Sequence, residues 1–462
     1  MRHAGGALVM LMLSGCATAP LAASPTPTTS VTASPVASPS PSAEPSPSPI
    51  AYGAPQYRAL WVDAFNDGIK SRAQIQKLVA DAHQANLNVL IVQVRKRGDA
   101  YFNRADEARA LDIIGSRGFD PLSYVIELAH ASRPRIEVHA WLNTFFVGDT
   151  SGVYLKHGDW ANRTNDGVTG GYLDPAIPEV QAYTHKVFMD VALNYDVDGI
   201  HMDFVRYPGV NWGYSTAALS QYRNDTGATG VPAPDDSRWQ AWRRERVTAF
   251  VRDLHTDLQQ KKPSVKLSGA LICFGSGPAN LANWWRTSAY SSVFQDWADW
   301  IIKGYIDFGV PMNYDSEWIG REKAWFDGWL AFEKDSGFAN RVVTGMGAFL
   351  NYPDDTLSEI RRVLAPSARG NRVLGVAIYS YAATSVYGNS DFYNAPDLYS
   401  GLPRQPYAGG ITTPAGLDAR AHMFNDTFMT QLSQPAGYRD VQLGLIQTQP
   451  VFTLPAELPP LP

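Results

Sequence analysis

Cysteine is nearly absent from this sequence, and charged residues are sparse. Only two cysteines, Cys16 and Cys273, occur among 462 residues, which excludes a disulfide framework and a metal site built from cysteines. Charged residues make up 18% of the chain, and the net charge of −5 offers no basic field. We therefore expect no nucleic-acid partner.

The chain also lacks the local motifs of common cofactors and activated nucleophiles. It has no glycine-rich dinucleotide fingerprint, no phosphate-binding loop, no helix with paired histidines and no Gly-x-Ser-x-Gly elbow. Its histidines fall on different predicted strands beside arginines, which would repel a cation. We expect neither a cofactor nor a metal.

Long hydrophobic runs are missing as well. The longest near the start, Ala7 to Leu13, is too short to span a bilayer and has the layout of a secretory signal. It leads into Leu13-Ser14-Gly15-Cys16, which resembles a bacterial lipobox. We expect residues 1–15 to be a signal peptide and Cys16 to carry the lipid of an exported, membrane-anchored lipoprotein. The alternative is ordinary signal cleavage near Ala19 or Ala23.

Composition divides the rest of the chain. Residues 17–50 are almost entirely Ala, Ser, Thr and Pro with one charge, Glu44, so we predict a disordered tether over 16–50. Residues 51–400 have the length of an α/β barrel with long loops. Residues 401–462 are predicted to be an extension that packs on the barrel or is partly extended. We expect a monomer.

From residue 57 onward, predicted strands alternate with helical patterns, which is typical of parallel βα units. Eight strands with intervening helices predict an α/β fold, a (β/α)₈ TIM barrel with long βα loops. A last helix is predicted from Thr413 to Leu432. The strands are expected at 57–65, 88–94, 136–144, within 198–208, and at 265–273, 308–314, 341–349 and 373–381.

Polar residues gather at the ends of five of these strands. Because the C-terminal strand ends of such a barrel form one face, these side chains are expected to meet in one mouth. Aromatic residues are abundant, with 13 Trp and 22 Tyr, as a sugar-binding cleft requires. The polar residues are Asp63, Arg95, Arg97, His139, Asn143, Asp203, Arg206, Asn313, Asp315 and Glu317.

Five motifs in this order resemble the glycosyl-hydrolase-like family ten: Tyr57–Val62, Gln93–Tyr101, His139–Asn143, Leu173–Pro175 and Asp198–Pro208. The resemblance covers roughly residues 52–390 and implies a (β/α)₈ barrel. For envelope members it also implies hydrolysis of peptidoglycan glycan strands that have lost their stem peptides. Phe204 stands where many relatives have a second Asp, so the resemblance does not identify the second carboxylate.

Glycoside hydrolysis requires two carboxyl groups, one protonated and one ionised. We predict Asp203 as the ionised group, its pKa lowered by Arg206 or Arg95, and Asp315 as the acid, with Glu317 and Asp63 as alternatives. A structural ion pair between Asp203 and Arg206 is the competing interpretation.

Further residues are predicted to bind a polysaccharide substrate. Each histidine could instead be a satisfied interior residue, and the arginines could simply neutralise nearby carboxylates. Alternatives to hydrolysis are a wall-tethering lipoprotein that only binds glycan, and a retaining transglycosylase. The substrate-binding candidates are Asp63, Arg95, Arg97, His139, Trp141, Asn143, His201, Arg206, Tyr207, Asn313, Tyr314 and Trp318.

Overall fold

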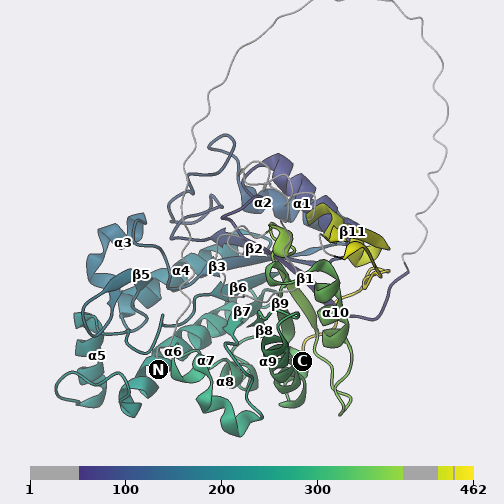
Figure 1. The fold of residues 1–462 in the computed structure, drawn as a ribbon. Helices are drawn as coiled ribbons and strands as arrows, with labels where there is room; N and C mark the ends of the chain where they lie inside the picture. Colours follow the sequence, from purple (N-terminus) through teal and green to yellow (C-terminus); the bar gives the residue numbers. More distant parts are fainter. Residues whose placement is uncertain (1–50, 389–424, 441–442) are drawn as a thin grey trace, which may run out of the picture. The chain divides into compact units, whose positions relative to one another are not determined.

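Eight parallel strands form the centre of the computed structural model, which describes residues 51–388, 425–440 and 443–462. They close into a barrel in the order β1-β10-β9-β8-β7-β6-β3-β2, with helices around it (Figure 1). The predicted (β/α)₈ class is confirmed. The barrel strands are β1 (Tyr57–Val62), β2 (Val89–Arg95), β3 (Glu137–Asn143), β6 (Gly199–Asp203), β7 (Lys266–Ile272), β8 (Phe308–Asn313), β9 (Val343–Gly347) and β10 (Gly375–Tyr379).

Ten α-helices accompany these strands between residues 51 and 388. The first begins where a capping residue predicts it, since the Ser71 side chain accepts a hydrogen bond from the Gln74 backbone N–H. The helices are α1 (Arg72–Gln84), α2 (Pro121–Ala131), α3 (Gly152–Lys156), α4 (Pro178–Asn194), α5 (Thr216–Thr226), α6 (Ser237–Lys261), α7 (Ser288–Ser291), α8 (Trp297–Ile302), α9 (Gly320–Asp335) and α10 (Pro353–Leu364).

Two small sheets were not predicted. β4 (Ala161–Arg163) and β5 (Thr169–Leu173) form a hairpin in the segment between β3 and α4, and β11 (Ala436–Asp440) pairs with β12 (Gly444–Thr448). The short helix α8 was also missed, because the aromatic residues before β8 were interpreted as a loop. Residues 425–433 are helical, in agreement with the end of the predicted C-terminal helix.

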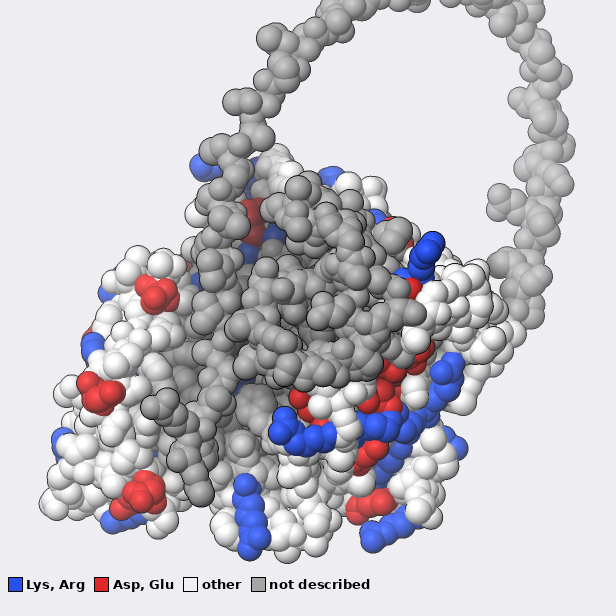
Figure 2. All heavy atoms as spheres, viewed as in Figure 1, with Lys and Arg blue, Asp and Glu red and all other residues white. Residues whose placement is uncertain are grey.

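Several predictions lie outside the described residues. They concern the signal peptide, Cys16, the tether over 16–50, and the beginning of the C-terminal helix. Among the described residues, no helix combines the length and the apolar character needed to cross a membrane. On the face drawn in Figure 2, Lys and Arg side chains are interspersed with Asp and Glu side chains, so the described part of that face has no large patch of one sign.

Side chains alternate between the barrel interior and the helix layer along β1. Trp61 belongs to the interior cluster, which also holds Trp141 and Val310, whereas Leu60 and Val62 pack outward in the main core. This alternation is the predicted period of two. The same alternation directs the side chain of Asp63, which directly follows β1, toward the barrel interior.

The C-terminal segment covers the N-terminal end of the barrel. The Gly53 backbone N–H donates to the Pro455 carbonyl at 2.8 Å, and Asn88 Nδ2 donates to the Ala456 carbonyl at 3.0 Å. Leu458 and Leu461 pack against the interior cluster. The opposite end, formed by the C-terminal ends of the strands, is where the sites of such barrels lie.

One carboxyl group is buried between α9 and the barrel. Glu333 is fully buried, its Oε2 accepts a hydrogen bond from the Thr344 hydroxyl, and its Oε1 has no hydrogen-bond partner. Burial raises the pKa of Glu333 to about 8. In the folded protein this group therefore holds a proton that the unfolded chain releases near pH 4 to 5.

Glu333→Gln is expected to stabilise the protein at alkaline pH. Since the pKa of Glu333 is raised in the folded state, its unfavourable contribution grows as pH rises from about 4.5 to about 8. The gain in unfolding free energy relative to wild type should be about 4 kcal/mol larger at pH 8.5 than at pH 5. Denaturant unfolding at both pH values measures this. Glu127→Gln, at an exposed position of α2, is the control, and a gain independent of pH would contradict the prediction.

Candidate active site

Asp203 is the last residue of β6, at the C-terminal end of the barrel. Its side chain is oriented by two donors: Trp141 Nε1 donates to Oδ2 at 3.2 Å, and the Phe204 backbone N–H donates to Oδ1 at 2.6 Å. Arg206 Nη1 lies 3.6 Å from Oδ1. The predicted ion pair is therefore present, and it lies where a site is expected.

Burial has a larger effect on Asp203 than its positive neighbour. Asp203 is 5% exposed, and burial raises its pKa, while Arg206 and the hydrogen bonds lower it by less. The net direction is upward, so the predicted lowering of this pKa is wrong. A raised pKa suits a carboxyl group that holds a proton for donation.

Asp63, directly after β1, is a second carboxyl group at the same end of the barrel. Its Oδ1 accepts hydrogen bonds from the backbone N–H groups of Phe65 and Asn66 at 3.0 Å each and from Asn66 Nδ2 at 2.9 Å. Its Oδ2 accepts from the Ser380 hydroxyl at 3.3 Å. Three N–H donors on one oxygen stabilise negative charge there.

Tyr379, the last residue of β10, lies next to residues that contact the two carboxyl groups. The pKa of its phenol is raised first by burial and then by the negative charges of both Asp63 and Asp203. The Tyr379 ring centroid lies 6.3 Å from that of Trp141, whose Nε1 donates to Asp203, and the next residue, Ser380, donates to Asp63. Asp63, Asp203 and Tyr379, with the residues that follow the C-terminal strand ends, are called the mouth below.

Asp315 follows the end of β8 by two residues and is buried. The prediction that Asn313 and Asp315 point into the mouth is wrong for Asn313, whose Nδ2 donates to the Phe326 carbonyl on α9 at 3.0 Å. Phe308, Val310 and Tyr314 fill the interior from this strand instead. Apolar side chains occupy both faces of β8, so polarity alone gave the wrong parity.

The charges around Asp315 also differ from those in the mouth. Burial first, and then the charge of Glu322, raise the pKa of Asp315 to about 7. Asp315 in turn raises the pKa values of the buried Cys273 and Glu359. A pKa near 7 suits the predicted general acid, but two of these neighbours, Glu322 and Glu359, lie on the helices α9 and α10.

Glu317 is held in ion pairs and cannot act as the predicted alternative acid. Arg362 Nη1 donates to Oε1 at 2.7 Å, Nη2 donates to Oε2 at 2.6 Å, and Lys323 also contacts Oε1. Both oxygens are thus occupied by cations from α9 and α10. We assign Glu317 a structural role.

The side chains of Arg95 and Asn143 are also held by hydrogen bonds within the protein. Arg95 is fully buried: its Nε donates to Glu107 at 2.7 Å, Nη1 to the Asn143 carbonyl, and Nη2 to the Tyr183 hydroxyl at 3.3 Å. Asn143 Nδ2 donates to the Lys96 carbonyl at 2.7 Å. Their predicted contacts with substrate are therefore not available without breaking this network.

The two interior histidines have protein partners. His201 Nε2 accepts from Trp61 Nε1 at 3.1 Å, and its Nδ1 lies 2.9 Å from the Ser268 hydroxyl. His139 Nε2 lies 3.0 Å from Glu137 at the start of β3, far along the strand from its C-terminal end. Both are fully buried. The interpretation as a satisfied interior residue holds for His201, which has a partner on each ring nitrogen, whereas the Nδ1 of His139 has no hydrogen-bond partner.

Two predicted stacking residues pack elsewhere. Tyr207 is fully buried against Phe294, with ring centroids 5.7 Å apart, and its hydroxyl donates to Asp174 at 3.4 Å. Trp318 packs on a separate cluster around Tyr352, and its Nε1 donates to the Leu350 carbonyl at 2.9 Å. Neither ring belongs to the mouth as we define it.

Half-buried aromatic rings flank Asp203, and most of them were not predicted. Tyr314, which was predicted, has its ring centroid 5.4 Å from that of Tyr379; burial first, and the Asp203 charge to a smaller extent, raise the pKa of the Tyr314 phenol. A second group surrounds Phe204, with its ring centroid 5.1 Å from Phe146 and 6.0 Å from Tyr172. These rings come from different loops, so no sequence spacing connects them.

Phe204 has an unusual backbone. Its φ of 50° lies in the left-handed region, which bulky residues rarely adopt. Arg206 lies over its ring at 4.4 Å from the centroid, and the ring is half-buried. Strain beside a carboxylate supports a functional site.

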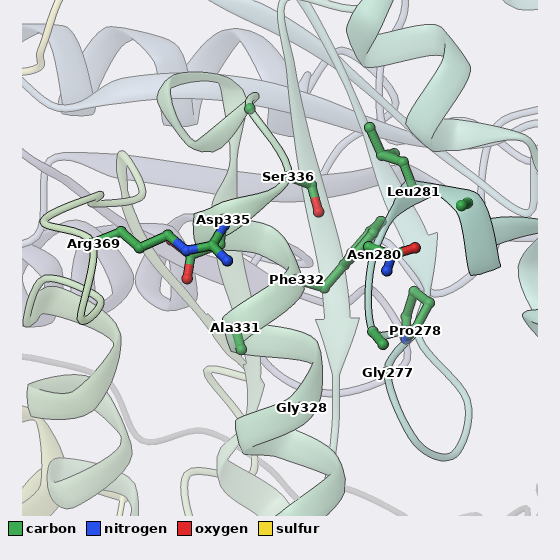
Figure 3. A pocket seen from close by; sticks show the side chains of 13 residues that line it. Gly277, Pro278, Asn280, Leu281, Gly328, Ala331, Phe332, Asp335, Ser336 and Arg369 are labelled. Carbon is green, nitrogen blue, oxygen red and sulfur yellow. The ribbon is translucent and has the colours of Figure 1, made fainter.

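A hollow of about 860 Å³ lies away from these residues. Its lining comes from the second half of α9, residues 277–282 and Arg369 (Figure 3). Its single carboxylate, Asp335, accepts from Ser367 and Asn371, at 2.7 and 2.8 Å. A glycosidase needs two convergent carboxyl groups, so we place the candidate site at the mouth. Within the described ranges, no three His, Cys, Asp or Glu residues are grouped to hold a metal.

The family model for glycosyl hydrolase-like 10 matches residues 56–330, which include Asp63 and Asp203. This chain belongs to the glycosyl hydrolase-like 10 family. The family assignment agrees with the resemblance seen in the motifs and with the closed parallel barrel.

Two relatives of this family member are described as glycosyl hydrolases. YngK of Bacillus subtilis is 27% identical over 309 residues, which cover 59% of this chain and 56% of YngK. DigH of Escherichia coli is 24% identical over 283 residues, covering 53% of this chain and 58% of DigH. The match thus spans little more than half of either relative.

Solved structures share the fold at low identity. The glycoside hydrolase domain of PgaB from Bordetella bronchiseptica superposes with a TM-score of 0.55 at 13% identity, covering 74% of this chain and 98% of that domain. An alpha-L-fucosidase from Paenibacillus thiaminolyticus gives a TM-score of 0.51 at 16% identity, covering 70% and 45%. At these identities the likeness shows a common barrel fold.

Proposed function

We propose that this protein is a glycoside hydrolase that cleaves peptide-free glycan strands of bacterial peptidoglycan by a two-carboxylate mechanism. The observation that carries the proposal is the placement of two carboxyl groups at one end of the barrel: Trp141, which packs against Tyr379, donates to Asp203, and Ser380, the residue after Tyr379, donates to Asp63. The family assignment and the relatives described as glycosyl hydrolases support the reaction class. The flanking aromatic rings offer surfaces on which sugars stack.

In this proposal the two carboxyl groups have different roles. Asp203, whose pKa is raised by burial, donates its proton to the glycosidic oxygen as the bond to the anomeric carbon breaks. Asp63, with three N–H donors on Oδ1, supplies the negative charge that stabilises the sugar cation or activates the water. Arg206, at 3.6 Å, stabilises Asp203 once its proton has left.

Substrate cleavage tests the proposed function directly. Residues 51–462 are incubated with peptide-free glycan strands, intact peptidoglycan and chitin-type oligomers, and new reducing ends are measured. We expect cleavage of the peptide-free strands. Binding of all three without cleavage would favour the glycan-binding alternative, and products longer than the substrate would favour a transglycosylase.

We further propose that the protein is exported and anchored through lipid on Cys16, because Leu13-Ser14-Gly15-Cys16 resembles a lipobox. Cys16→Ser is expected to move the protein from the membrane fraction to the soluble fraction. Cell fractionation with detection of the protein measures this. Cys273→Ser, which changes the buried cysteine, is the control and should stay with the membrane. Retention of Cys16→Ser on the membrane would contradict lipid anchoring.

A further inference from the structure

Arg97 is a cation without an ion-pair partner near the mouth. It lies two residues beyond β2, is half-buried, and forms no ion pair with any described residue. The nearest carboxylate in sequence, Asp99, accepts hydrogen bonds through Oδ1 from the backbone N–H groups of Lys96 and Arg97, at 3.0 and 2.8 Å, and not from the guanidinium. The Arg97 charge is therefore available.

The Arg97 side chain is nevertheless held in place. Its guanidinium carbon lies 5.0 Å from the centroid of Phe65, which follows Asp63 by two residues. Its aliphatic carbons run past Gly148, where an added Cβ would lie 3.5 Å from three of them. Packing of the stem on glycine and the ring below the guanidinium reduce the entropy that a ligand contact would cost.

The residues around Arg97 connect it to the catalytic candidates. Phe65 donates its backbone N–H to Asp63, and Phe146, two residues before Gly148, packs against Phe204 beside Asp203. Arg97 therefore stands at the rim of the mouth, in contact with the loops that follow β1 and β3. The neighbouring Lys96 is neutralised by Asp112, at 2.6 Å, which leaves Arg97 as the unpaired cation of this segment.

We propose that Arg97 and the ring of Phe65 form a subsite that binds a carboxylate carried by a sugar of the substrate. This inference rests on the proposed function, because peptide-free peptidoglycan strands carry a free lactyl carboxylate on every second sugar. A guanidinium fork matches the two oxygens of a carboxylate, and the site is partly desolvated. Arg97 would thus favour strands without stem peptides over those in which the carboxylate is amide-linked.

The test compares one substrate with and without its charge, using the full-length chain in detergent. Peptide-free strands are used untreated or after conversion of their carboxylates to methylamides. Wild type is expected to lose roughly tenfold in kcat/KM on the amidated strands, the scale of one charge-assisted hydrogen bond. Arg97→Gln should lose the same factor on untreated strands and nothing more on amidated ones, while Arg97→Lys should lose less.

Controls separate this inference from the proposed function. Arg72→Gln removes an arginine that also lies over a ring, 4.4 Å from the centroid of Tyr124. It should leave kcat/KM unchanged on both substrates. Equal losses for Arg97→Gln on both substrates, or no loss on either, would overturn the subsite. If wild type cleaves neither substrate, the proposed hydrolysis fails. Calorimetric binding of the same strands then tests the subsite separately. Weaker binding of amidated strands by wild type alone would still support the subsite, and equal binding would overturn it.

Discussion

Asp203→Asn is expected to lower kcat on peptide-free glycan strands by roughly a thousandfold or more, the scale of losing a catalytic group. The amide keeps the shape of the side chain but cannot donate a proton to the glycosidic oxygen. The fold should persist, because one oxygen can still accept the Phe204 backbone N–H. Initial rates and melting temperatures of variant and wild type measure the two effects.

The substrate series tests the role of Asp203 as the proton donor. Glycosides with good leaving groups need less protonation, so they should recover part of the activity of Asp203→Asn. Wild-type activity should fall as pH rises through the raised pKa of Asp203, and this alkaline decline should be absent from the variant. Near-native turnover with an unchanged melting temperature would contradict the assignment. Early melting would instead favour a structural ion pair with Arg206.

Asp63→Asn is expected to reduce kcat by roughly a hundredfold or more, whereas Asp315→Asn should retain turnover within a few-fold. Trp141, which packs against Tyr379, donates to Asp203, and Ser380 donates to Asp63, whereas the titratable neighbours of Asp315 are Glu322, Cys273 and Glu359. Loss of the Asp63 charge removes the ionised partner that hydrolysis requires. Parallel kinetics of the two variants, with melting temperatures, measure this difference.

The opposite result would restore the sequence-based assignment. A large loss for Asp315→Asn at an unchanged melting temperature, with Asp63→Asn active, would make Asp315 the second carboxylate. Because Asp63 also accepts backbone N–H groups of the loop after β1, Asp63→Asn needs its own stability control. Ser380→Ala provides it, since it removes a 3.3 Å hydrogen bond to Asp63 without removing the charge.

The barrel was predictable because its signals are local. Turn residues, helix caps such as Ser71 and the repeated alternation of strands and helices act over fewer than thirty residues each. The period of two along β1 also predicted that Trp61 and Asp63 share the inward side. Strand-end chemistry then pointed to Asp203 without knowledge of any contact.

The same reasoning failed on β8 because a barrel strand is buried on both faces. With Phe308 and Val310 inside and Asn313 against α9, the polar residue marks the helix layer and not the mouth. When both faces of a strand are apolar, its period of two does not indicate which face points into the barrel and which points to the helices. The ion-pair partners of Arg95 and Glu317 could not be predicted either, since Glu107 and Arg362 lie in other segments of the chain.

By itself, the sequence determined the barrel class, the order of its strands along the chain and the position of Asp203 at a strand end, because these depend on short-range periodicity and capping. Only the tertiary structure decided which charged side chains are held in ion pairs and which carboxyl groups lie at the candidate site. Glu317 and Arg95 are held in ion pairs, and burial raises the pKa of Asp203. Asp63 accepts a hydrogen bond from Ser380, which lies 317 residues later in the chain. Burial and long-range pairing depend on distance in space, which residue spacing does not encode.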